Sequence, residues 1–264
     1  MKKNLILTAA AGMLFAASSA FADGIIAKKD GTEIKVKTIE VSAKRGDYRY
    51  TEQDGIGKSI KKGEVKWAWV SKPEKIKELD GKSGASAADY LKLAEEFKAV
   101  SWEPHCLLRA ARIELNAGRK TEAVAILEKL QGYKNINPKN ENQVMEAYEL
   151  LVKTYIEQGA FDKAVPVADV LIDSLDDNIA CSALLAKGDA LKAKAEQSGD
   201  KETLKLAALS YFEAALLFPK SEKTPAALLA SYNCMLAAKD ARAQKFAELL
   251  KKNYPKSSEA GKLK

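Results

Sequence analysis

The sequence predicts an α+β chain of two parts, a small N-terminal β-barrel followed by an all-α solenoid of helical hairpins. Residues 24–70 alternate apolar and polar side chains between turn signals, as short strands do. From residue 86 nearly to the end, apolar residues recur at helical spacing instead. The 264 residues are 47% hydrophobic with 7 Pro and 15 Gly, a composition that excludes collagen-like and disordered classes.

Residues 1–22 are expected to be a signal peptide. Lys2 and Lys3 precede an apolar run over 5–17, and Ala20-Phe21-Ala22 supplies the small-x-small cleavage pattern, with the cut after Ala22. The apolar run is too short to span a bilayer, and no later stretch is long enough, so no transmembrane segment is expected. We therefore expect an exported chain, in the periplasm first and secreted as the alternative.

Residues 23–72 form the predicted β module. Asp30-Gly31 signals a tight hairpin turn, and Asp54-Gly55 marks a second turn. About five short strands fit into this stretch, and since isolated hairpins are marginally stable, a small closed barrel is expected. The module holds 12 Lys/Arg and 8 Asp/Glu, so it is basic, whereas the remainder of the chain is nearly balanced.

The second predicted strand changes phase along its length. Ile34 and Val36 alternate, and then Ile39 and Val41 alternate in the opposite phase, which predicts a bulge or bend near Thr38. With the Lys-Asp-Gly turn before it and a final strand after Lys-Gly-Glu-Val, this pattern resembles the small Sm-like or Src-homology-type barrels found at the N-terminus of some exported bacterial repeat proteins.

Two aromatic pairs lie in the predicted strands, Tyr48 with Tyr50 and Trp67 with Trp69. Each pair projects from one face of its strand because side chains alternate along a strand. With the nearby lysines, the four rings are candidates for a platform that holds a glycan or an extended peptide. The alternative is that the rings fill the core of the module, since aromatics dominate small cores.

A linker over 73–85 is expected to join the module to a helical array over 86–258, and a disordered tail over 259–264 to follow. Within the array, Ser86, Pro104 and Pro225 mark helix starts. The clearest repeat copy has a large residue, Leu, a further apolar residue, an aromatic, Gly at the turn and Ala at the helix contact: Tyr148, Leu151, Val152, Tyr155, Gly159 and Ala164.

This copy closely resembles the tetratricopeptide (TPR) repeat, in which paired helices stack into a solenoid. Val152 replaces the small residue usual in that family. The clearest copy starts near 145 and the weaker copies near 104, 181 and 224, so the period varies from 36 to 43 residues, against about 34 in regular arrays. Small residues at 111, 164, 188 and 207 are expected to let neighbouring helices approach closely.

No catalytic spacing is present. The motifs HExxH, CxxC, GxSxG and GxGxxG do not occur, and His105 is the only histidine, so we expect no enzyme activity, no metal and no cofactor. Only six of the 43 basic residues are Arg, which, together with export, argues against nucleic-acid recognition. Cys106, Cys181 and Cys234 are expected to be small core residues, with a Cys181–Cys234 bridge as the alternative.

The leading functional hypothesis is a non-enzymatic scaffold that binds a protein or peptide partner of the envelope. The TPR resemblance implies a concave groove lined by polar positions of each first helix. Carried over by position, these are His105, Arg112, Glu149, Lys153, Asp189 and Tyr232. Two alternatives stay open: binding of an anionic envelope polymer, such as a glycan or peptidoglycan, by the basic β module, and membership of a secretion or outer-membrane assembly complex.

Overall fold

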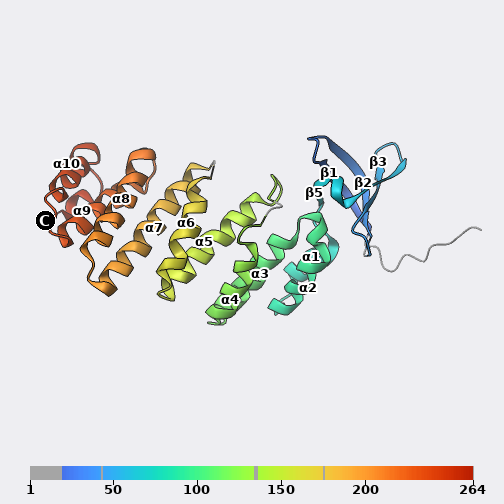
Figure 1. Cartoon of the computed structure of the whole chain (residues 1–264), viewed down its shortest axis with the longest axis horizontal. Helices are drawn as coiled ribbons and strands as arrows, with labels where there is room; N and C mark the ends of the chain where they lie inside the picture. The colour runs from blue at the N-terminus through green and yellow to red at the C-terminus, as the bar shows by residue number, and fades with distance from the viewer. Residues whose placement is uncertain (1–19, 43, 134–135, 175, 264) are drawn as a thin grey trace, which may run out of the picture. The chain divides into compact units, whose positions relative to one another are not determined.

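The computed structural model describes residues 20–263, apart from 43, 134–135 and 175 (Figure 1). The described chain is α+β: an antiparallel sheet comes first and ten α-helices follow. It divides into two compact units. One contains the described residues up to Ser83 together with Glu95–Glu103, and the other contains Gly84–Ala94 and the chain from Pro104 onward. Most of the predicted signal peptide lies outside the described residues.

The sheet has five strands in the order β4-β3-β2-β1-β5, and every neighbouring pair is antiparallel. Their bounds are β1 (Ala20–Lys28), β2 (Glu33–Val41), β3 (Tyr48–Glu52), β4 (Gly57–Ile60) and β5 (Val65–Val70). The predicted turns are confirmed, with Gly31 at φ 89° between β1 and β2 and Gly55 at φ 85° between β3 and β4. The predicted cleavage motif over 20–22 forms the first part of β1.

The predicted bulge in the second strand is confirmed. The pairing of β2 with β3 shifts register between Val36 and Thr38. Val36 and Ile39 are both fully buried although they are three residues apart, because the bulge returns the strand to the same face. The phase change in the sequence therefore reflects a bend that keeps both side chains in one core.

The prediction of a closed barrel is wrong, because the described sheet is open and β4 and β5 are its edges. The four-residue β4 connects to β5 through the short 3-10 turn η1 (Lys62–Glu64) rather than through a hairpin. The β5 edge is covered by the segment 95–103 instead: Ser101 donates its hydroxyl to the Ala68 carbonyl (2.6 Å), and the Trp102 indole donates to the Val70 carbonyl (2.9 Å). Side chains thus satisfy edge carbonyls that closure would have paired.

The helices occupy most of the remaining chain. Their bounds are α1 (Glu74–Gly81), α2 (Ala87–Phe97), α3 (Glu103–Asn116), α4 (Lys120–Leu127), α5 (Glu141–Glu157), α6 (Phe161–Ile172), α7 (Asp177–Ser198), α8 (Lys201–Leu217), α9 (Thr224–Ala237) and α10 (Ala243–Asn253). Gly159 (φ 72°) lies in the turn between α5 and α6, where positive φ reverses the chain at little steric cost. Gly199 does the same between α7 and α8, and Asp200 then caps α8 by accepting from the backbone of Glu202 and Thr203.

Successive helices from α4 to α10 pack on one another, and α5 also contacts α7 (Figure 1). Close approach of α7 and α8 is confirmed at Gly188, where an added Cβ would lie 2.6 Å from the ring of Tyr211. The small residues Ala111, Ala164 and Ala207 are fully buried, as expected for positions where helices touch. Small residues therefore lie at the points where these helices come closest.

The predicted linker and tail both contain structure. The linker over 73–85 holds α1, whose Ile76 is fully buried. In the predicted tail over 259–264, Ala260–Lys262 forms the 3-10 turn η4, and Leu263 packs against the apolar clusters of the last helices. All three cysteines are buried and none is in a disulfide, so the Cys181–Cys234 bridge is not formed.

Candidate functional site

The exposed faces of α3, α5 and α7, with the approach to α9, carry a strip of charged and polar side chains, which we call the first-helix strip. It begins with an ion pair between Arg112 of α3 and Glu146 of α5. Both side chains remain more than 40% exposed, so the pair is solvated and contributes little to folding. It links two neighbouring helices that the sequence alone does not place together.

Glu149 continues the strip one turn further along α5. Partial burial and the nearby Asp176 raise the pKa of its carboxyl, and attraction to Lys223 opposes this shift. Lys223, which precedes α9, also donates to the hydroxyl of Ser182 on α7 (2.6 Å). Side chains of α5 and α7 and of the approach to α9 therefore meet around Glu149.

Lys153 extends the strip toward the C-terminal end of α5 and is exposed. Glu157, one turn beyond, forms an ion pair with Lys120 at the start of α4 (2.8 Å). That hydrogen bond and the charge of Lys153 lower the pKa of Glu157. Three carboxylates and one ammonium group thus lie along this side of α5, at Glu146, Glu149, Lys153 and Glu157, a pattern suited to a polar segment of mixed charge.

Of the six predicted groove residues, Arg112, Glu149 and Lys153 belong to this strip. His105 is half-buried in the first turn of α3. Asp189 is exposed, but its carboxylate accepts a hydrogen bond from Tyr211 of α8 (2.5 Å), which gives it a part in joining two helices. Tyr232 is 3% exposed and lies in the apolar cluster of the last helices, so it is a core residue.

Sequence reasoning missed Glu146, Ser182 and Lys223, the other members of the strip. The spacing of residues 146, 149 and 153 along one helical face was the signal that could have found the first of them. Ser182 and Lys223 have no such signal, because their proximity to α5 depends on how the helices pack.

Three of the four rings proposed for the aromatic platform lie in the core of the β module. Tyr48, Tyr50 and Trp67 are each no more than 9% exposed, and Trp69 is half-buried. Tyr48 donates its hydroxyl to the Ala99 carbonyl (3.0 Å), and burial raises the pKa of this phenol. The rings are therefore arranged as packing groups, and the exposed face of the sheet carries polar side chains instead.

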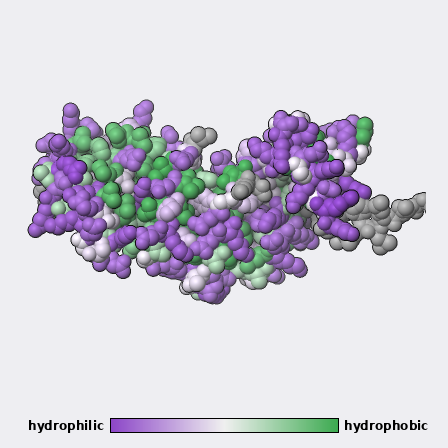
Figure 2. Space-filling model, in the orientation of Figure 1, coloured by the Kyte–Doolittle hydropathy of each residue, from purple (hydrophilic) through white to green (hydrophobic). Residues whose placement is uncertain are grey.

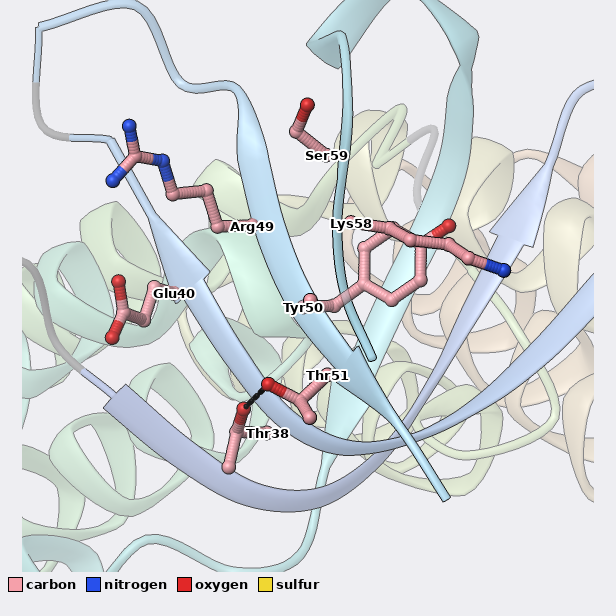
Figure 3. A pocket seen from close by; sticks show the side chains of 8 residues that line it. Thr38, Glu40, Arg49, Tyr50, Thr51, Lys58 and Ser59 are labelled. Atoms are coloured by element: carbon pink, nitrogen blue, oxygen red, sulfur yellow. Dashed lines mark hydrogen bonds between the residues drawn. The ribbon is translucent and has the colours of Figure 1, made fainter. Parts of the chain in front are cut away.

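A hollow of about 420 Å³ lies on the strands β2, β3 and β4 (Figure 3). Its lining residues are Thr38, Glu40, Arg49, Tyr50, Thr51, Gly57, Lys58 and Ser59. Strand register sets two rows of side chains across the hollow, Glu40–Arg49–Ser59 and Thr38–Thr51–Gly57.

Within the second row, the hydroxyls of Thr38 and Thr51 are hydrogen-bonded at 3.0 Å. Lys58 pairs with Glu52 at 2.9 Å, and this hydrogen bond raises the pKa of Lys58. Two or three residues from each of three strands form this site, so it becomes visible only once the register is known.

Within the described ranges, no cluster of three or more His, Cys, Asp or Glu side chains is arranged to hold a metal ion. None of the helices described is both long enough and apolar enough to cross a bilayer. Comparison with models of known protein families gives no match, and a search of curated proteins also finds no similar sequence.

Proposed function

We propose that the chain is an exported, non-enzymatic scaffold of TPR-like helical hairpins that binds a peptide or protein segment on the first-helix strip. Three features support the TPR-like interpretation. These are the residue pattern of α5 and α6, the glycine turn between them, and the contact of α5 with α7, the first helix of the next hairpin. The signal-like N-terminus supports export and, with it, a partner in the bacterial envelope.

The observation that carries this proposal is the continuity of the strip across separate hairpins. Arg112–Glu146 joins α3 to α5, and Glu149 and Ser182 lie near Lys223 beside α7 and α9. Core packing does not require these groups, because the buried contacts are apolar. Exposed charges of both signs along successive helices favour an extended partner that also carries charges of both signs.

The test compares the wild-type chain with an Arg112→Glu/Lys153→Glu variant in an affinity capture from an envelope fraction. Protein bands retained by the wild type are expected to be lost with the variant, while its far-ultraviolet circular dichroism stays unchanged. Equal retention of the same bands by both forms would contradict the assignment of the strip.

Two controls isolate the effect of the strip. Arg112→Glu/Glu146→Arg reverses the ion pair without changing net charge, and it reports whether the sign at each position matters. Lys245→Glu/Lys251→Glu makes the same net change as the test variant on exposed positions of α10, outside the strip. This second variant is expected to capture the partner as well as wild type.

A second candidate function is binding of an anionic envelope polymer by the β module. The hollow on β2–β4 favours it, because hydroxyl, guanidinium and ammonium groups around one cavity suit a hydroxylated, acidic chain. Retention of peptidoglycan or acidic glycan should fall with added salt, since the Debye length shortens from about 10 Å at 0.1 M to about 3 Å at 1 M. Arg49→Glu should abolish this retention. Retention that does not change with salt would contradict binding of an anionic polymer by the β module.

A further inference from the structure

The outer face of α8 carries a row of exposed leucines. Leu206, Leu209, Leu216 and Leu217 are 52%, 45%, 64% and 56% exposed, respectively. Figure 2 shows hydrophobic side chains gathered over the α7–α9 part of the visible face. The opposite face of α8 is buried in the array, so core packing does not require these leucines. Exposed apolar rows of this kind mark interaction surfaces.

Leu206, Leu209 and Leu216 fall at the spacing of a coiled-coil seam. The seam positions alternate four and three residues apart: Glu202, Leu206, Leu209, Glu213, Leu216 and Lys220. The first five lie on one exposed side of α8, and Lys220 is exposed just beyond its C-terminal end. We call this set the α8 seam. A seam of this spacing packs against a second helix rather than against a flat surface.

We infer that the α8 seam is a self-association surface that pairs two copies of the chain with their α8 helices antiparallel. In this arrangement, Leu206 of each copy packs against Leu216 of the other, and Leu209 packs against the aliphatic part of Glu213. Because the relation is two-fold, every contact occurs twice and the interface closes on itself.

The charges at the two ends of the seam select this arrangement. Antiparallel pairing places Glu202 of each copy beside Lys220 of the other, so opposite charges meet at both ends. Parallel pairing would set Glu213 against Glu213. A one-heptad slip would set Glu202 against Glu213 in one direction, and in the other it would set Leu209 against Lys220 and Leu216 against Glu213. Neither alternative pairs opposite charges at both ends of the seam.

Glu202 is available for this contact. It pairs with Lys205 within its own helix at 2.7 Å, yet its side chain remains 76% exposed and can accept a second cation. The carboxylates at 202 and 213 also disfavour a lipid surface with anionic headgroups as the occupant of the seam. A second copy satisfies both the leucines and the terminal charges.

The first test measures association of the purified chain by sedimentation velocity over low to high micromolar concentrations. The wild type is expected to shift from monomer toward dimer as concentration rises. Leu209→Glu/Leu216→Glu is expected to remain a monomer over the whole range. The control is Leu236→Glu, which places one such charge on an exposed leucine of α9 outside the seam and should dimerise like wild type.

The second test uses charge reversal. Glu202→Lys sets two lysines together at each end of the interface and should weaken dimerisation at least tenfold. Glu202→Lys/Lys220→Glu restores opposite charges and should recover most of the loss. Circular dichroism and thermal unfolding of every variant separate loss of association from loss of fold.

A third test reports the orientation of the helices. A mixture of chains carrying Leu206→Cys and Leu216→Cys should form disulfide-linked dimers faster than either chain alone. A wild-type chain that stays monomeric at all concentrations would overturn the inference, as would a dimer that the seam variants leave intact. The seam shares no residue with the first-helix strip, so these results are independent of partner capture by the strip.

Discussion

The hydroxyl of Tyr211 in α8 donates a 2.5 Å hydrogen bond to the carboxylate of Asp189 in α7, and its ring lies against Gly188. Burial of the ring and the bond to Asp189 both raise the pKa of this phenol. One side chain therefore joins two helices by packing and by a hydrogen bond. The absence of a side chain at position 188 makes room for it.

The first prediction concerns that space. Gly188→Ala should lower the free energy of unfolding by about 1–3 kcal/mol, because the added methyl would overlap the Tyr211 ring and force it to move. Urea denaturation followed by circular dichroism measures the change. Gly261→Ala, where no atom lies within 4 Å of the added methyl, is the matched control and should be nearly neutral. Equal stability of the two variants would contradict the packing argument.

The second prediction concerns the hydrogen bond itself. Tyr211→Phe keeps the ring but removes the hydroxyl. It should lower the free energy of unfolding by about 0.5–1.5 kcal/mol, the usual net contribution of such a hydrogen bond. Asp189 is the acceptor for Tyr211. Adding Asp189→Ala to a chain that already carries Tyr211→Phe should therefore change the free energy of unfolding little. A double-mutant cycle in urea measures this coupling. Additive losses from the two substitutions would show that they act separately.

The third prediction is a loss of stability in alkali. Burial raises the pKa of the Cys234 thiol from its ordinary value of 9.0 to about 11. The folded chain then holds a proton that the unfolded chain releases first, so the contribution of Cys234 to stability is constant below pH 9 and falls as the pH rises toward 11. The contribution of Cys234 is at most about 3 kcal/mol. Cys234→Ala should show a shallower decline over this range in urea titrations at fixed pH.

The same burial predicts low thiol reactivity. Cys234 is 2% exposed, and at neutral pH its thiol stays protonated. Alkylation of the native chain with iodoacetamide should therefore leave Cys234 unmodified until urea unfolds the array, as peptide mass mapping would report. Rapid modification of Cys234 in the native chain would contradict its burial.

The fourth prediction concerns acid. Glu128 accepts hydrogen bonds from Tyr155 (2.5 Å) and Lys163 (3.2 Å), and these lower the pKa of its carboxyl below the ordinary value of 4.5. The stabilisation is fully present above pH 4.5 and is lost as the pH falls through the lowered pKa. Glu128→Gln should flatten this part of the stability profile. Glu248→Gln, on an exposed position of α10, should leave it unchanged.

The fifth prediction concerns the covered edge of the sheet. Ser101 is 6% exposed and donates to the Ala68 carbonyl of β5. Ser101→Ala removes this donor. It should lower the free energy of unfolding by about 1–2 kcal/mol, because a buried carbonyl loses a hydrogen bond. Hydrogen exchange of β5 amides should accelerate, whereas the exposed Ser258→Ala should change nothing. Unchanged exchange would mean that other contacts hold the edge.

The local features of this chain could be predicted from the sequence because their causes lie within a few residues. The turns at Gly31, Gly55 and Gly159 depend on residues that tolerate positive φ. The bulge before Thr38 appears as a change of apolar phase along one strand. Helical spacing and small residues identify an array of close-packed helices, and they single out Gly188 before its contact with Tyr211 is known.

Only the tertiary structure decided which of the predicted groove residues are accessible to a partner. Asp189 and Tyr232 occupy first-helix positions like those of Glu149 and Lys153, yet Tyr211 engages one and the apolar cluster buries the other. The sheet remains open because residues 95–103, some thirty positions further along the chain, cover the β5 edge. Periodicity reports how a segment folds, whereas these outcomes depend on contacts between distant segments that no local pattern records.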